Sequence, residues 1–95
     1  MSTIRFNADS YRVASGLIEC LAHPVRIEIL LILHAEGLLN STQLLRKCSF
    51  GASSLYYHLD KLKSSQFIKT VRIRQDVYYQ LANPQVGRAL VKLST

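Results

Sequence analysis

Cysteines and long hydrophobic runs are scarce in this sequence. Its 95 residues include only two cysteines, Cys20 and Cys48, and no Cys-x-x-Cys pair, whereas a secreted disulfide-bonded domain of this size would need more. The longest apolar run, residues 29–33, is far too short to span a bilayer, and the N-terminus lacks the apolar stretch of a signal peptide. We therefore expect a soluble, cytoplasmic protein without a membrane partner.

The motifs of enzymes are also missing. The sequence has no glycine-rich phosphate loop, no nucleophile elbow and no metal-binding pair of side chains. It also has no repeat, no low-complexity segment and no linker. These absences favour a single non-catalytic domain over residues 1–95 that binds no cofactor.

Acidic residues are few, and the charge is unevenly distributed. The chain has 12 Lys and Arg against 6 Asp and Glu, a net charge of +6. The excess lies in residues 41–75, where Asp60 is the only acid among Arg46, Lys47, Lys61, Lys63, Lys69, Arg72 and Arg74. A polyanion is the natural partner of such a segment, and nucleic acid is favoured over a membrane surface. The alternative is an ordinary basic, solvated surface.

Helical spacing dominates the first half of the chain. A first helix is expected to start near residues 7–10, with Gly16 in its middle, where glycine is unfavourable unless another segment packs closely. Pro24 and Gly37 bound a very apolar second helix, the expected centre of the core. One apolar face is predicted to be traced by Val25, Ile27, Leu30, Leu31 and His34, and to be widened by Ile29, Ile32 and Leu33.

Two further helices and a hairpin follow. Asn40 and Gln43 form a capping-box pattern at the start of a short third helix, and a turn through Gly51 leads to a fourth helix over residues 52–64 with Leu55, Leu59 and Leu62 on its buried side. Alternating residues then predict strands over residues 68–74 and 77–81, with the hairpin tip at Gln75-Asp76, and a last helix from Pro84. The predicted fold is mainly α with a β-hairpin wing, a winged helix-turn-helix in the order α-α-α-α-β-β-α.

The exposed face of the fourth helix is the main candidate for DNA binding. A helical wheel places serine, tyrosine and lysine side chains opposite or beside the leucine stripe, namely Ser53, Ser54, Tyr56, Tyr57 and Lys61. Side chains near the start of a recognition helix reach base edges, while the preceding helix crosses the DNA backbone. Thr42 and Arg46 are the backbone-contacting candidates on that preceding helix. The alternative is a solvated polar face without a ligand.

The hairpin offers a second set of basic side chains. If Val71 and Ile73 face the core, Arg72 and Arg74 project outward together and can contact a minor groove or phosphates. Lys69 is a further candidate on the same strand. The alternative is that these charges only protect an edge strand from aggregation.

Three segments, taken in order, resemble a known family. Residues 21–30 (LAHPVRIEIL), 53–62 (SSLYYHLDKL) and 77–81 (VYYQL) are similar to blocks of the arsenic-repressor (ArsR) family of winged helix-turn-helix regulators, whereas MarR-type proteins fit less well. The resemblance implies a homodimer that binds an imperfect palindrome in double-stranded DNA and represses transcription. It also implies that the first and last helices form the dimer interface, through Val13, Leu17, Val86, Leu90 and Leu93; the alternative is that these residues belong to the core of one chain.

The sequence departs from the metal sensors of this family. Their C-V-C-D-L block corresponds here to residues 40–44 (NSTQL), and residues 84–95 contain neither Asp nor His for a second site. Soft thiolate or imidazole ligands are therefore absent, and no metal site is expected. The family usually has a glycine near the wing tip, where this sequence has Arg74. Cys20 and Cys48 are candidates for a redox switch, with buried apolar cysteines as the alternative. The sequence does not identify an effector, and a winged-helix module that binds a protein partner remains the rival function.

Overall fold

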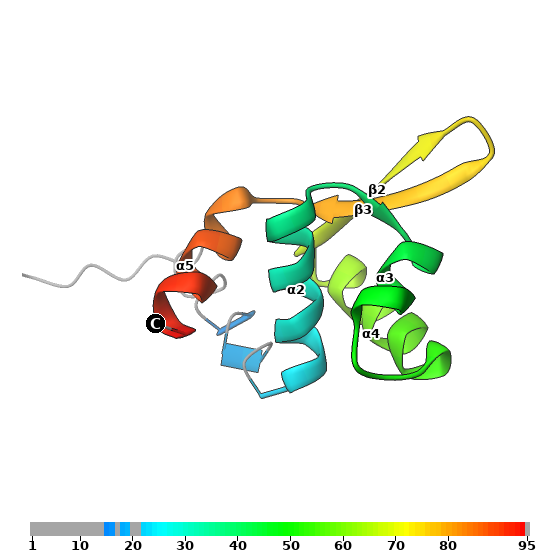
Figure 1. Cartoon of the computed structure of the whole chain (residues 1–95). Coiled ribbons are helices and arrows are strands. Elements are labelled where there is room, and N and C mark those ends of the chain that lie inside the picture. The colour runs from blue at the N-terminus through cyan, green and yellow to red at the C-terminus, as the bar shows by residue number, and fades with distance from the viewer. Residues whose placement is uncertain (1–14, 17, 20–21, 95) are drawn as a thin grey trace, which may run out of the picture.

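The computed structural model describes residues 15, 16, 18, 19 and 22–94 (Figure 1). Ser15, Gly16, Ile18 and Glu19 have helical backbone, but the rest of the expected first helix, including Val13, Leu17 and Cys20, lies outside the described residues. The elements that follow are α2 (Pro24–Glu36), β1 (Leu39–Asn40), α3 (Ser41–Lys47), α4 (Ala52–Ser64), β2 (Ile68–Ile73), β3 (Asp76–Leu81) and α5 (Pro84–Ser94). This order confirms the predicted winged helix-turn-helix.

Helix α2 is the centre of the fold. Pro24 occupies its first turn, and Gly37 ends it with a φ of 88°, a backbone conformation that glycine adopts without strain. Figure 1 shows α5 on one side of α2, with α3 and α4 on the other. The predicted apolar face of α2 was partly wrong. The most buried side chains are Ile29, Leu30 and Leu33, at 0–1% exposure, and the same stripe includes Arg26 at 5%.

The remaining core residues come from every element around α2. The leucine stripe of α4 is fully buried, as predicted, with Leu55 at 0% and both Leu59 and Leu62 at 1% exposure, and Leu44 of α3 is fully buried as well. Leu39, Phe67, Ile68, Val86 and Leu90 complete the buried cluster, and Phe50 of the α3–α4 turn packs against it. No helix in the described part of the chain is long and apolar enough to cross a bilayer.

The wing belongs to a three-stranded antiparallel sheet in the order β1-β3-β2. Strand β1 was not predicted; its two residues pair with Tyr79 and Tyr78 of β3. Ile73 pairs with Asp76, so the hairpin tip is Arg74-Gln75, one residue earlier than expected. Arg74 has a φ of 59°. It therefore occupies a left-handed conformation that favours glycine, at the position where the resembled family usually has one.

Two glycines allow helices to approach their neighbours closely. A Cβ atom on Gly16 would lie 2.9 Å from Cζ of Phe67, which supplies the close packing that a glycine in the middle of the first helix requires. On α5, a Cβ atom on Gly87 would lie 2.6 Å from Cγ of His34 and 2.7 Å from its Cβ. His34, in the last turn of α2, is thus part of the α2–α5 contact.

We expect Gly87→Ala to destabilise the protein, because the added methyl group overlaps His34 at atoms close to the α2 backbone. The cost should be about 1–3 kcal/mol, as for other overpacked sites, measured by urea unfolding at fixed protein concentration. Gly51→Ala is the matched control, because a Cβ atom there meets nothing within 4 Å; its cost, a weaker N-cap, should stay below about 1 kcal/mol. Equal losses in the two variants would contradict close α2–α5 packing at Gly87.

Candidate nucleic-acid interface

Hydrogen bonds fix both the start of α3 and the turn that joins α3 to α4. At the start of α3, the Gln43 backbone N–H donates to Oδ1 of Asn40 at 2.8 Å, and the Asn40 N–H donates to Oε1 of Gln43 at 2.9 Å, which confirms the capping box. After α3, the carboxylate of Glu28 on α2 accepts bonds from the backbone N–H and the Oγ–H of Ser49, both at 2.8 Å. These contacts set the position at which α4 begins.

The face of α4 opposite its leucines is open to solvent. Ser53 and Lys61 are exposed, Tyr57 is 55% exposed, and Ser54 is half-buried. The Lys61 ammonium lies 5.7 Å from the centroid of the Tyr57 ring, a cation–π arrangement that holds both groups on this surface. An open helix face that combines hydroxyls, an aromatic ring and a positive charge suits contacts with bases and phosphates.

Tyr56 links α4 to α3. Its ring is 51% exposed, and its hydroxyl donates a hydrogen bond to Oγ of Ser41 at 3.2 Å. Thr42 and Arg46, the candidates for contact with the DNA backbone, lie exposed on α3. The same helix carries Ser41, to which Tyr56 is hydrogen-bonded. Lys47, by contrast, forms an ion pair with Glu36 at 2.6 Å.

The prediction that Val71 and Ile73 face the core was wrong. Ile68 is the buried residue of β2, at 2% exposure, and strand alternation places Thr70 and Arg72 on its face. Val71 and Ile73 therefore lie on the opposite face with Lys69, and Ile73 is 42% exposed.

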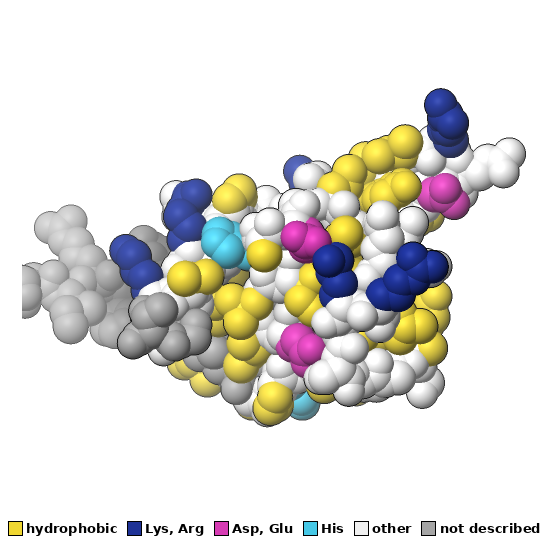
Figure 2. Space-filling model, viewed as in Figure 1, with side chains coloured by type: hydrophobic (Ala, Val, Ile, Leu, Met, Phe, Trp, Pro, Cys, Tyr) yellow, Lys and Arg dark blue, Asp and Glu magenta, His cyan; other side chains and the backbone are white. Residues whose placement is uncertain are grey.

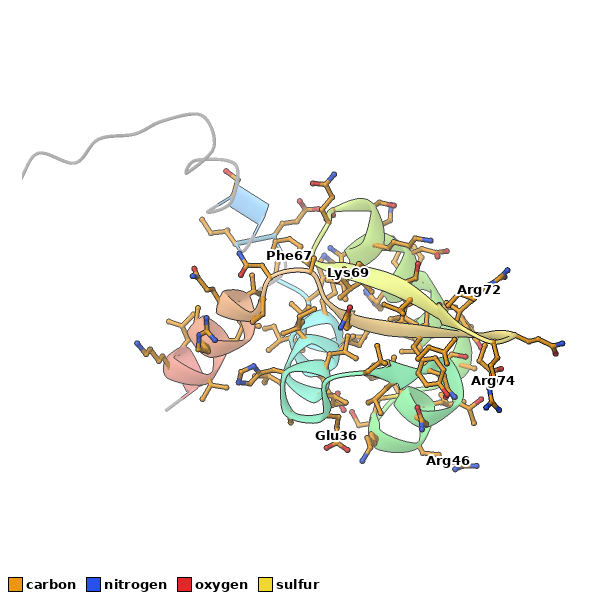
Figure 3. The ribbon with its side chains drawn as sticks, turned by 90° about the horizontal axis from the view of Figure 1, so that it is seen from above. Glu36, Arg46, Phe67, Lys69, Arg72 and Arg74 are labelled. Atoms are coloured by element: carbon orange, nitrogen blue, oxygen red, sulfur yellow. The ribbon has the colours of Figure 1, made fainter. Side chains whose placement is uncertain are left out.

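The two wing arginines do not project together either. Arg74 lies in the turn rather than on the strand, and Figure 3 shows Arg72 and Arg74 pointing to opposite sides of the hairpin, with Lys69 near its base beside Phe67. Figure 2 shows basic side chains over α3 and at the wing tip, with hydrophobic side chains along the wing between its base and its tip. The wing thus offers separate positive groups on both sides of one narrow ribbon.

The base of the wing packs against the body of the molecule. Tyr79 of β3 is half-buried against the core. Burial, followed by the proximity of Tyr56 and Asp60, raises the pKa of Tyr79, so its hydroxyl stays protonated at neutral pH. The base of the wing therefore packs on the body of the molecule through a neutral side chain.

Sequence reasoning missed a polar contact beneath the recognition helix. The guanidinium of Arg26, on the buried side of α2, donates from Nε to Nδ1 of His58 on α4 at 3.2 Å. Desolvation, then the positive charge of Arg26 and the nearby His23, lower the pKa of His58. Nothing in the sequence joins these two residues, which are 32 positions apart.

The remaining candidates lie away from this surface. Val86 and Leu90 are buried in the core of the chain, at 8% and 3% exposure, whereas Leu93 is 70% exposed on α5. Cys48 is a half-buried free thiol that contacts the carbonyl oxygens of Leu45 and Phe50, each at 3.5 Å. Among the described residues, no group of three or more His, Cys, Asp or Glu could hold a metal ion.

Comparisons with known proteins agree with this geometry. Residues 21–71 match a family described as a helix-turn-helix domain. The chain is 31% identical, over 77 residues, to the transcriptional repressor PagR of Bacillus anthracis, covering 81% of this chain and 76% of PagR. The crystal structure of PagR superimposes on this chain with a TM-score of 0.80 at 28% identity. The superposition covers 92% of this chain and 99% of that chain.

Other solved structures are similar as well. The transcriptional regulator HlyU from Vibrio vulnificus superimposes with a TM-score of 0.75 at 28% identity, with 90% of this chain and 88% of that chain covered. The repressor BigR from Xylella fastidiosa has a TM-score of 0.78 over 90% of this chain and 86% of its own. At 24% identity, the likeness to BigR concerns the fold.

Proposed function

The chain belongs to the ArsR-type winged helix-turn-helix regulators, and we propose that it represses transcription by binding a specific sequence in double-stranded DNA. In this proposal α4 enters the major groove, with Ser53, Ser54, Tyr56, Tyr57 and Lys61 as its contact residues. Arg72, Arg74 and Lys69 contact the DNA from the wing, and Thr42 and Arg46 contact the backbone from α3.

The arrangement of α4 is the observation that carries the proposal. Its leucine stripe is buried at 0–1% exposure, while Ser53, Tyr57 and Lys61 on the opposite face are open to solvent. Among the described residues, none buries Ser53, Tyr57 or Lys61, so these side chains are available for a ligand, and α4 lies within the basic segment, residues 41–75. The relative PagR is described as a transcriptional repressor, which favours DNA over a protein partner.

Binding to a duplex at several salt concentrations tests this function. With a fluorescent duplex of random sequence, we expect affinity to fall steeply as salt rises, because Lys and Arg displace counterions from phosphates. Capture of an acidic protein without duplex binding at low salt would instead support the protein-interaction function.

We further propose that the regulator acts as a homodimer on an imperfect palindrome. The outer side of α5 exposes Val91 and Leu93, at 39% and 70%, and Ile18 of the first helix is 68% exposed. Exposed aliphatic side chains on the two terminal helices suit an isologous contact between copies of the chain. Val86 and Leu90 support that contact from beneath rather than touching the partner directly.

Leu93→Glu should weaken this dimer without unfolding the chain, because the side chain is exposed in one protomer. Placing a carboxylate in an apolar interface should raise the dimer dissociation constant by ~10-fold or more, measured by sedimentation velocity over a range of protein concentrations. Gln85→Glu, the same charge change at an exposed position near the start of α5, is the control and should leave the constant unchanged. A wild-type monomer at micromolar concentration, free and on DNA, would contradict the dimer.

A further inference from the structure

The contact between Arg26 and His58 lies directly beneath the proposed recognition surface. Arg26 is 5% exposed, and its Nε–H points at Nδ1 of His58, 3.2 Å away. Buried arginines are rare unless paired. Arg26 also has an acidic partner, Glu19 of the first helix, but this ion pair is long, at 3.9 Å, and the Glu19 side chain is 70% exposed. The neutral His58 ring is thus the closest partner of a buried charge.

His58 also contacts a side chain on the exposed face of α4. Its ring packs edge-on against Tyr57, with centroids 5.1 Å apart and planes at 83°. The Lys61 ammonium also lies over the Tyr57 ring, at 5.7 Å from its centroid. A continuous series of contacts therefore runs from Arg26 through His58 to Tyr57, the most exposed aromatic side chain of α4.

We propose that Arg26 and His58 form a positioning pair, in which the buried guanidinium fixes the His58 ring as a neutral acceptor and that ring fixes Tyr57 for DNA reading. This inference rests on the proposed DNA-binding function. Neither residue touches DNA in the proposal; both act through Tyr57.

Protonation of His58 should disrupt the pair. A protonated Nδ1 cannot accept the Arg26 bond, and the imidazolium would face the Arg26 guanidinium and His23, whose ring centroid is 5.8 Å away. Within the described part of the chain, the charged and titratable groups around His58 are Arg26 and His23 from α2 and its N-cap, Glu19 through Arg26, and Tyr57 and Lys61 on α4 itself. Because the pKa of His58 is lowered in the fold, the neutral pair is complete above the ordinary histidine value of about 6.5 and is lost as pH falls through the lowered value.

Sequence-specific and non-specific binding should therefore respond differently to acid. We expect wild-type affinity for a duplex selected from a random pool to fall ~10-fold between about pH 7.5 and about pH 5 at constant ionic strength, the effect of losing one charge-assisted hydrogen bond. Affinity for an unselected duplex should stay level or rise, because the added positive charge favours phosphate. Circular dichroism at each pH verifies that the protein remains folded.

Two histidine variants separate positioning from general acid sensitivity. His58→Gln keeps a neutral acceptor that does not titrate but lacks the ring that packs against Tyr57, so it should bind the selected duplex more weakly than the wild type at about pH 7.5 and lose the pH dependence. His23→Gln should retain it. The same pH profile in His58→Gln as in the wild type, or a wild-type profile that is flat, would overturn the inference.

A titration without DNA distinguishes this inference from the proposed function. In Arg26→Met, the midpoint of His58, followed through its Cε1–H NMR signal, should rise toward the ordinary histidine value, since the nearby charge is gone. An unchanged midpoint would overturn the pair. If the wild-type protein bound no duplex at any pH, the proposed function would fail. A raised His58 midpoint in Arg26→Met would still establish the contact between Arg26 and His58.

Discussion

Replacing Leu59 with alanine should cost more stability than any change on the exposed surface of α4. Leu59 is 1% exposed in the middle of the buried α4 stripe, between Leu55 and Leu62. Truncating a core leucine removes buried apolar surface and leaves a cavity, which costs about 2–5 kcal/mol. Since domains of this size have a free energy of unfolding of about 5–15 kcal/mol, the loss is a large fraction of the total. The thermal midpoint should fall on the order of 10 °C or more.

Asp60→Ala is the matched control for this change. Asp60 follows Leu59 in the chain but is exposed, and its replacement should alter the free energy of unfolding by less than about 0.5 kcal/mol. Urea unfolding of both variants must be measured at one protein concentration, because the proposed dimerisation would make stability depend on concentration. Similar losses in the two variants would mean that α4 does not pack on the core through its leucine stripe.

The second large effect concerns the two kinds of DNA contact. Tyr57 and Ser53 lie on the open face of α4, and changing either to alanine should cost about 1–3 kcal/mol on the preferred sequence and reduce discrimination between sequences. In the proposed function, Arg72 and Arg74 contact phosphates or the minor groove from the wing. Changing either to alanine should weaken binding to all sequences alike and make the salt dependence less steep by about one unit per phosphate contact, or about two in a dimer.

Equilibrium binding to a selected and a random duplex at several salt concentrations separates these effects. Arg88→Ala removes one positive charge from α5, which Figure 1 places on the opposite side of α2 from the wing, and it should change neither the salt slope nor the specificity. Because Arg72 and Arg74 point to opposite sides of the hairpin, their losses should be independent and add in the double variant. Wing variants that lose specificity while Tyr57→Ala and Ser53→Ala bind normally would assign sequence reading to the wing.

The helices were predictable from local signals in the sequence. Pro24 and Gly37 bound α2, and Asn40 with Gln43 caps α3, because these residues act on the backbone within one turn of their own position. The bounds of α4 and its buried leucine stripe followed in the same way from i, i+4 and i+7 spacing. Local chemistry of this kind does not depend on the rest of the fold.

The features that the sequence did not predict depend on tertiary contacts. Strand β1 is two residues long and exists through pairing with β3, almost forty residues later. The inward face of β2 is set by Ile68 at its first position, and alternation alone gives two equally regular faces. Likewise, α2 is apolar nearly all round, so its spacing did not show that the buried stripe includes Arg26.

Selection of duplexes from a random pool by the wild-type protein tests most directly whether this fold reads DNA sequence. We expect a few rounds of binding at moderate salt to enrich one imperfect palindrome, with half-sites about one helical turn, roughly 34 Å, apart. Tyr57→Ala, selected in parallel, should enrich it more weakly. A pool that binds the protein but stays random in sequence would contradict sequence-specific recognition by α4.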